Sequence, residues 1–308
     1  MTPPRSRPPG TGRTRPEGTI TRGTTNPNRL RRVDRWAVHL LEPVLRRASD
    51  RLVVDLGYGA SGVTPRELHD RLRAAYPRVR TLGLEIHPDR VAGALPWATA
   101  GLDFRLGGFE IPVDRAPAGT VPGERPVLVR AANVLRQYDE EEVRRSWARM
   151  AARLAPDGFL VEGTCDEIGR KQVFVTIRPA YATVHRGLAE RRGAAVSLRT
   201  VDDPPPVEPM TLTISVDTEV LERPSAVADR LPKALIHRNV PGERIYAYLQ
   251  ELDRHWDLAA GLAAFSGRQR WIAMASSAHA AGVPVVRSPA RWRLGEITVP
   301  WDHVRPHD

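Results

Sequence analysis

Residues 52–62, with the sequence LVVDLGYGASG, decide the fold. A short, continuous apolar run over residues 52–56 predicts a strand that is buried on both faces, as in a parallel sheet. Gly57 permits a tight turn after this strand, and Gly59 lets the backbone approach a ligand because it has no Cβ. A helix is predicted directly after the turn, and the N–H groups at its start favour a carboxylate or a phosphate.

Strands and helices alternate along the chain on both sides of this turn. Strands are predicted at residues 81–86, 102–106, 127–132 and 159–164, and a helix is predicted at 140–154. Such alternation indicates an α/β fold with helices on both faces of the sheet. Residues 171–177 and 210–218 alternate polar and apolar side chains, which predicts an antiparallel pair at the sheet edge. The predicted fold class is therefore Rossmann-like, with a mostly parallel sheet and an antiparallel edge strand.

The composition divides the chain into three parts. Residues 1–28 are rich in Pro, Arg, Gly and Thr, so we expect a disordered basic arm that cannot bury enough surface to order itself. Residues 29–220 are expected to form the ligand-binding domain. Residues 221–308 are expected to be a helical extension packed on the same domain, because Ile245, Leu249, Leu252 and Trp256 have the spacing of an amphipathic helix.

Composition also restricts the partners and the compartment. The formal net charge is +10, which favours an anionic partner such as a nucleic acid. No apolar run is long enough for a membrane span, and the N-terminus lacks the apolar core of a secretory signal. Cys165 is the only cysteine and the histidines do not cluster, so we expect no metal site. A cytoplasmic protein without a membrane partner is expected, and the oligomeric state stays open.

Two nucleotide cofactors are compatible with the glycine turn. Gly57, Gly59 and Gly62 match the dinucleotide pattern G-x-G-x-x-G, so an NAD(P)-linked oxidoreductase is one alternative. Asp55, however, ends the first strand, where a carboxylate favours an ammonium group and repels a pyrophosphate. Glu85 ends the second strand, where an acid can accept both ribose hydroxyls. Together these acids favour S-adenosyl-L-methionine (SAM).

The segment from Leu52 to Ile177 resembles a class I SAM-dependent methyltransferase. The D-x-G-x-G element at Asp55, the acid Glu85 and the turn of residues 156–158 carry this resemblance. The phrases TTNPNRLRRVDRW, VRAANVLRQYDEEEV, EGTCDEIGR and LPKALIHRNVPGE are similar to a group of uncharacterised actinobacterial methyltransferases. With them the resemblance extends over most of residues 24–275, and it names no substrate.

The resemblance implies a set of cofactor contacts. The amino-acid part of SAM would lie at the glycine turn, the ribose at the end of the second strand and the adenine after the third. The predicted cofactor-binding residues are Asp55, Gly57, Tyr58, Gly59, Ser61, Glu85, Ile86, Gly108, Phe109 and Arg130. Gly108 and Phe109 stand where the family often has an Asp before a small residue, so Phe109 would stack on the adenine instead.

The methyl acceptor is not identified by any motif. Arg130, Asn133 and Tyr138 follow the fourth strand and are candidate catalytic residues, with Arg136 as a further acceptor contact. The Asn/Asp-Pro-Pro-aromatic element of many nucleic-acid N-methyltransferases is absent. Cys165 stands where RNA 5-methylcytosine enzymes place a nucleophile, but their second cysteine is missing. RNA and a small molecule both remain possible acceptors, and a non-catalytic SAM-fold protein that binds RNA or a partner is a third alternative.

Overall fold

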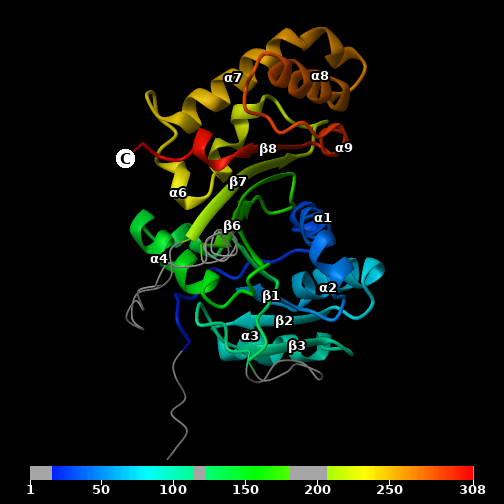
Figure 1. Cartoon of the computed structure of the whole chain (residues 1–308), viewed down its shortest axis with the longest axis vertical. Coiled ribbons are helices and arrows are strands. Elements are labelled where there is room, and N and C mark those ends of the chain that lie inside the picture. The colour runs from blue at the N-terminus through cyan, green and yellow to red at the C-terminus, as the bar shows by residue number, and fades with distance from the viewer. Residues whose placement is uncertain (1–15, 114–122, 181–206, 308) are drawn as a thin grey trace, which may run out of the picture.

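An eight-stranded sheet with the order β3-β2-β1-β4-β5-β6-β7-β8 runs through the molecule (Figure 1). This computed structural model describes residues 16–113, 123–180 and 207–307. The strands are β1 (Leu52–Leu56), β2 (Arg80–Glu85), β3 (Leu102–Leu106), β4 (Leu128–Ala132), β5 (Phe159–Cys165), β6 (Lys171–Pro179), β7 (Val207–Val216) and β8 (Glu296–Pro300).

The first five strands are parallel to one another, and the last three are antiparallel to their neighbours. This arrangement confirms the predicted fold class, with strand bounds close to the predicted ones. The antiparallel part is larger than expected because β8 adds to the edge of β7 from far along the chain. Its short sequence, EITVP, contains three β-branched residues that favour a strand, but nothing local indicates its pairing with β7.

Helices cover both faces of the sheet. The α-helices are α1 (Arg31–Arg47), α2 (Val63–Ala75), α3 (Pro88–Ala94), α4 (Glu140–Ala151), α6 (Lys233–Ile236), α7 (Arg244–Leu258), α8 (Gly267–Ala280) and α9 (Pro289–Trp292). The 3-10 helices are η1 (Leu95–Trp97), η2 (Leu135–Gln137), η3 (Pro224–Arg230), η4 (Ala260–Ala264) and η5 (Trp301–His303).

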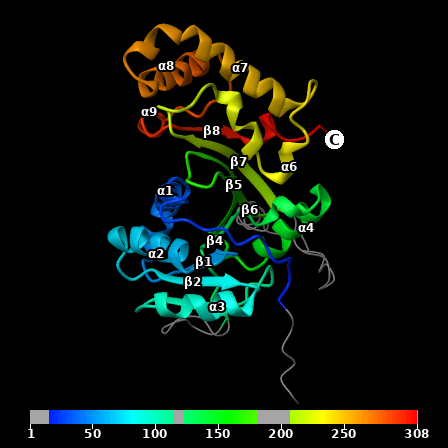
Figure 2. The same ribbon diagram turned by 180° about the vertical axis from the view of Figure 1, so that it is seen from behind.

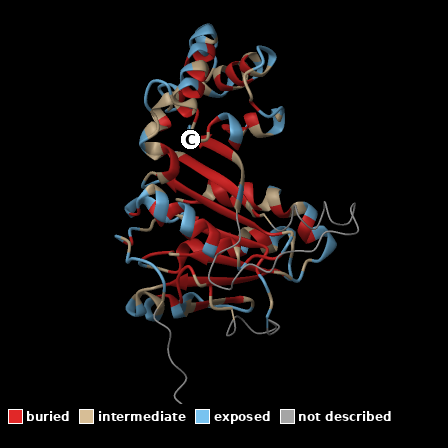
Figure 3. Cartoon of the chain, turned by 60° about the vertical axis from the view of Figure 1, so that its left-hand side comes forward, coloured by how far each residue is buried: buried red, intermediate tan, exposed pale blue. Residues whose placement is uncertain are grey.

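Strand alternation sends neighbouring side chains to opposite faces, and each face has its own core. Leu68 and Leu72 of α2 pack with α1 and with Val53 on one face. Val143 and Trp147 of α4 belong to the apolar cluster on the other face. Figure 3 shows the strands buried between helices whose outer surfaces are exposed.

The C-terminal residues extend the second of these cores. Trp271 and Met274 of α8 belong to the same cluster as Ile214 of β7 and Ile297 of β8. Residues 221–308, expected to be a helical extension, therefore also contribute the strand β8 to the sheet. Among the residues described, no helix is both long and apolar enough to cross a membrane.

The segment that precedes α1 differs from the expectation of a disordered arm. Residues 16–28 follow a defined path, and Figure 2 shows the blue segment running from α1 toward α4. Its residues form hydrogen bonds with the turns that follow the strands at one end of the sheet. Residues 1–15 of the predicted arm lie outside the described residues. The composition missed this path because the bonds use the segment's backbone rather than buried apolar side chains.

Candidate functional site

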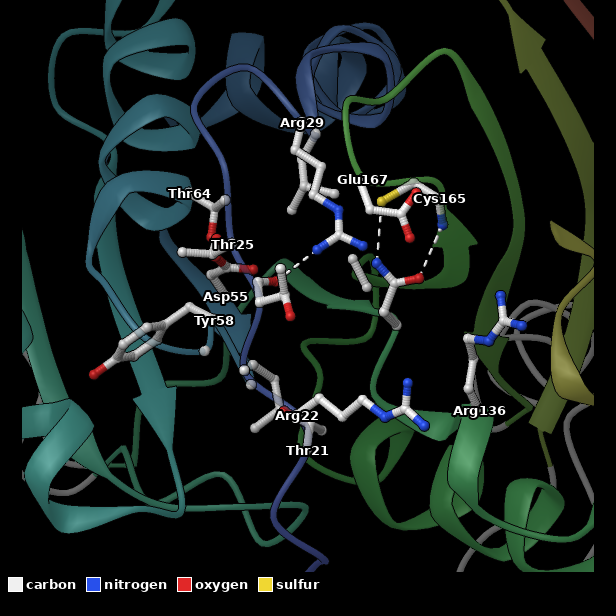
Figure 4. A pocket seen from close by; sticks show the side chains of 18 of the residues that line it. Thr21, Arg22, Thr25, Arg29, Asp55, Tyr58, Thr64, Arg136, Cys165 and Glu167 are labelled. Carbon is white, nitrogen blue, oxygen red and sulfur yellow. Dashed lines mark hydrogen bonds between the residues drawn. The ribbon is translucent and has the colours of Figure 1, made fainter.

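A cavity of about 510 Å³ lies at the carboxyl ends of β1, β4 and β5. Its walls come from residues 55–59 after β1, residues 132–137 after β4 and residues 165–167 after β5. Residues 21–25 of the N-terminal segment form a further wall (Figure 4). Ligands of open α/β sheets bind at this end of the strands, so the cavity is the candidate functional site.

The glycine turn at the cavity needs glycine at two positions. Gly57 and Gly59 have φ angles of 70° and 85°, in the left-handed region that side chains disfavour. A Cβ at Gly57 would lie 2.7 Å from the Val134 side chain. A Cβ at Gly59 would lie 2.7 Å from the carbonyl oxygen of Gly23. At Gly59, another backbone segment therefore lies close to the turn, and this segment is the chain's own N-terminal segment.

Asp55, at the end of β1, takes part in a buried ion-pair cluster. Its carboxylate accepts hydrogen bonds from Nε and Nη2 of Arg130 at 2.8 and 2.6 Å. Nη1 of Arg130 donates to Asp34 of α1, and Arg71 of α2 also pairs with Asp34. Burial raises the pKa of Asp34 to about 6, against the opposing effect of Arg130. The two guanidinium groups thus favour the carboxylate form of Asp34 in the interior, and Arg130 also pairs with Asp55.

The sequence analysis placed Arg130 at the edge of the acceptor site, and the structure places it elsewhere. Arg130 is fully buried and does not line the cavity; it lies behind Asp55, where its Nη2 also donates to the Thr64 carbonyl. The side chain of a residue in the middle of β4 points to the face that α1 covers, rather than out of the strand end. In this structure Arg130 compensates the charge of two buried carboxylates, and this position does not support a catalytic role.

Glu85 ends β2 as predicted, but its carboxylate is already bonded and buried. Oε2 accepts from the N–H of Gly59 at 3.0 Å, and Oε1 accepts from the N–H groups of Ile86 and His87 at 3.0 and 3.2 Å. Glu85 and Ile86 do not line the cavity. The hydroxyl of Ser61 lies 3.5 Å from the Val63 N–H. The structure therefore brings only part of the predicted cofactor set to the cavity wall, namely Asp55, Gly57, Tyr58 and Gly59.

The N-terminal segment covers the positions predicted for the adenosine part. The N–H of Phe109 donates to the carbonyl oxygen of Glu17 at 3.0 Å. A Cβ at Gly108 would lie 1.9 Å from the same oxygen, so the backbone of Glu17 rests directly on Gly108. Further along, Ala60 N–H donates to the carbonyl of Gly23 at 2.9 Å. Residues 17–23 therefore run from the predicted adenine position to the glycine turn.

Side chains from α3 and from the end of η2 bind the same segment. The Tyr138 hydroxyl accepts from the Thr19 N–H at 2.5 Å, and Gln137 Nε2 donates to the Thr19 carbonyl at 2.8 Å. Arg90 Nη2 donates to the Thr21 carbonyl at 2.8 Å. Tyr138, a candidate catalytic residue, is thus buried under the segment and does not line the cavity. We call residues 16–23 the strap.

Asn133 and Cys165 lie together at the cavity wall. Asn133 has a φ of 59°, a left-handed conformation that asparagine tolerates better than most residues. Its side-chain carbonyl accepts from the Cys165 N–H at 3.0 Å, and its amide donates to the sulfur at 3.0 Å. Burial raises the pKa of the Cys165 thiol, although Arg29 opposes the shift. A protonated thiol is a poor nucleophile. The two bonds of Asn133 to Cys165 join the ends of β4 and β5.

Several cavity residues were not found from the sequence. Arg22 and Arg29 lie at or next to the segment expected to be disordered, and Arg230 and Glu167 follow elements far away in the chain. No local motif marks them, because only the folded chain brings these loops together. In the described part of the chain, no group of three or more His, Cys, Asp or Glu side chains is placed to hold a metal ion.

Comparisons with known proteins find likenesses of structure but not of sequence. No protein family matches the chain, and no curated protein matches it. Human N-acetylserotonin methyltransferase, solved with SAM, has a TM-score of 0.29 at 20% identity, covering 43% of this chain and 35% of its own. The CMeT domain of the citrinin polyketide synthase has a TM-score of 0.33 at 19% identity, covering 42% and 34%.

A third neighbour is described as a pericyclic reaction enzyme, with a TM-score of 0.30 at 15% identity, covering 41% of this chain and 30% of its own. This chain thus spans about a third of the length of each of these proteins. Likenesses at this level assign no residue roles. The grouping with actinobacterial methyltransferases stays a prediction.

Proposed function

We propose that the chain is a SAM-dependent methyltransferase that transfers a methyl group to a small-molecule acceptor. The observation that carries the proposal is the Gly57–Gly59 turn, which opens with Asp55 onto the cavity at the carboxyl end of β1. RNA, the other acceptor considered from the sequence, fits less well because the cavity, about 510 Å³, has the size of a small-molecule site.

The charge near Asp55 supports an ammonium group at this place. Asp34, Asp55 and Glu67 supply three carboxylates, while Arg71 and Arg130 supply two guanidinium groups. With all five ionised, the cluster keeps one negative charge beside the cavity. The methionine amine of SAM is a cation of matching charge, and Asp55 is the member of the cluster that lines the cavity.

The adenosine part fits only if the strap moves. Glu17 occupies the N–H of Phe109, so a nucleoside cannot bind this donor while the strap is in place. The carboxylate of Glu85 is buried and bonded to the N–H groups of Gly59, Ile86 and His87. We propose that cofactor and strap compete for this half of the site. Hydrogen bonds between neutral groups contribute about 0.5–1.5 kcal/mol each, so a strap held by a few of them can be displaced by a tightly bound ligand.

When bound, SAM supplies a methyl group on a cationic sulfonium. The overall transfer forms a bond between the acceptor heteroatom and the methyl carbon, breaks the sulfur–methyl bond and releases the acceptor's proton. This chain's residues then have to orient the acceptor and exclude water. Asn133 fixes the wall where the acceptor would lie, through its bonds to the backbone and sulfur of Cys165. We expect the released proton to pass to solvent.

The dinucleotide alternative is disfavoured by the sheet. Dinucleotide-binding sheets consist of two mirrored halves, with a sixth parallel strand beyond β5. Here β6 follows β5 directly and is antiparallel to it, so the described sheet lacks the sixth parallel strand that would complete the second half. Asp55 also lies where the pyrophosphate would approach the turn.

Two measurements test the proposal. Equilibrium binding should show that the chain binds SAM and S-adenosylhomocysteine more tightly than NADH; preference for NADH would support the oxidoreductase instead. Incubation with methyl-labelled SAM and a cell extract should label the metabolite fraction. Label in RNA would change the acceptor class, and SAM binding with no label in any fraction would support a non-catalytic protein.

A further inference from the structure

The acceptor side of the cavity is lined by four arginines from three separate parts of the chain. Arg22 and Arg29 come from the N-terminal segment, Arg136 from the turn after β4, and Arg230 from the end of η3. Figure 4 shows Arg22, Arg29 and Arg136 extending from different walls toward the same space. Folding therefore brings together guanidinium groups from segments that lie far apart in the sequence.

Little of this positive charge is neutralised by protein groups. Within the described chain, Arg22, Arg29 and Arg136 form no ion pair, whereas Arg230 pairs with Asp229 at 3.2 Å. Arg29 is bonded to the carbonyl oxygens of Asp166 and Thr24 at 2.9 and 2.6 Å, so its charge stays uncompensated.

The negative groups on the cavity wall do not balance the arginines. Asp55 is already paired with Arg130 behind the wall, which leaves Glu167 as the other carboxylate that lines the cavity. Glu167 forms no ion pair in the described chain. The acceptor side is therefore positive overall, while the Asp55 side is negative.

The arginines also affect one another. Burial, and then the nearby charge of Arg230, lower the pKa of Arg136. Holding two guanidinium groups close together in a partly desolvated wall costs free energy, and a bound anion would recover it. Guanidinium groups match the two oxygens of a carboxylate or phosphate with paired hydrogen bonds.

We propose that the acceptor is a small molecule bearing a carboxylate or a phosphate group, which Arg136 and Arg230 bind with support from Arg29. This inference rests on the proposed function, since it names the acceptor class for the same cavity. The cavity volume, about 510 Å³, is in the range of small-molecule sites. The two halves of the cavity then differ in charge. A cation is favoured near Asp55, and an anion is favoured near Arg136.

The experiment uses the full chain and two probes, inorganic pyrophosphate and tricarballylate, titrated calorimetrically at constant ionic strength. Arg136→Gln/Arg230→Gln is the site variant. Arg145→Gln/Arg254→Gln is the matched control, because it removes the same charge from exposed helix positions. The site variant should weaken probe binding about tenfold or more, as expected for lost charge-assisted bonds, while the control should change it less than about twofold. The tighter probe identifies phosphate or carboxylate as the favoured group.

Equal weakening in both variants, or no saturable binding of either probe, would overturn the inference. Displacement of the probe by an unstructured RNA oligomer, with the oligomer's own binding lost in the site variant, would replace the small anion with a nucleic acid. SAM binding is measured on the same samples. Probe binding without SAM binding would refute the proposed function alone, and SAM binding without probe binding would refute this inference alone.

Discussion

The backbone carbonyl of Glu17 accepts a hydrogen bond from the N–H of Phe109, 3.0 Å away. Phe109 follows β3, at the place where the sequence predicts an adenine contact. The chain therefore satisfies with its own N-terminal segment a donor that a nucleoside would otherwise use. Because a buried N–H is costly to leave unpaired, the bond lets the closed site persist without a ligand.

Tyr138→Phe should tighten SAM binding. The change removes the hydroxyl that accepts from Thr19 N–H, and so weakens the strap without removing the ring that packs against Phe109. We expect the dissociation constant to fall about two- to tenfold, the effect of one neutral hydrogen bond. Titration calorimetry measures it, with Tyr246→Phe on α7 as the control. Weaker SAM binding in Tyr138→Phe would indicate that the hydroxyl contacts the cofactor directly and would contradict its role in holding the strap.

Arg130→Met should destabilise the fold strongly. It leaves the carboxylates of Asp34 and Asp55 buried without their shared cation. Breaking a buried pair in this way costs about 3–5 kcal/mol. Urea unfolding followed by circular dichroism gives the loss, and Arg145→Met, which removes an exposed arginine of α4, is the comparison. A loss no larger than that of the comparison variant would mean that the cluster is not structural.

Glu162 makes the stability of the fold depend on pH. Burial in β5 raises its pKa to about 8, with Trp147 opposing the shift, against 4.5 in the unfolded chain. The folded state binds this proton more tightly than the unfolded chain does. The contribution of the bound proton to the free energy of unfolding is therefore complete below pH 4.5 and is lost as the pH rises to about 8. Between these pH values the free energy of unfolding falls by about 1.4 kcal/mol per pH unit for one proton.

Glu162→Gln should remove this dependence, since the amide resembles the protonated acid. We expect similar unfolding free energies for both proteins near pH 4.5, and a more stable variant near pH 9. Urea unfolding across this range makes the comparison, and Glu141→Gln on the exposed face of α4 controls for the lost charge. Parallel curves for the wild type and Glu162→Gln would show that Glu162 does not titrate in this window.

The parallel half of the fold was predictable because its signals are local. The apolar run of residues 52–56 and the glycines after it define β1 and its turn, and β2 to β5 repeat the pattern. The antiparallel edge was predicted only in part. β8 pairs with β7 although some 80 residues separate them, and no local pattern encodes such a pairing.

The site was predictable where backbone geometry decides it and not where side chains from distant segments meet. Gly57 and Gly59 follow from the conformations they must adopt. The pairing of Arg130 with Asp34 and Asp55 brings together α1, β1 and β4, and sequence position alone could not distinguish it from a catalytic role. The strap was not predicted because the composition indicates only how much apolar surface a segment can bury. The strap is held instead by hydrogen bonds of its backbone.

The most direct measurement compares SAM binding by the full chain and by a chain that lacks residues 1–23. This truncation keeps Thr24 to Arg29, whose bonds hold the start of α1, and a thermal melt confirms that the shortened chain is folded. If the strap and the adenosine compete, binding should tighten about tenfold or more, because several bonds no longer favour the closed site. Equal or weaker binding after truncation would contradict the competition, and no SAM binding by either chain would contradict the proposed function.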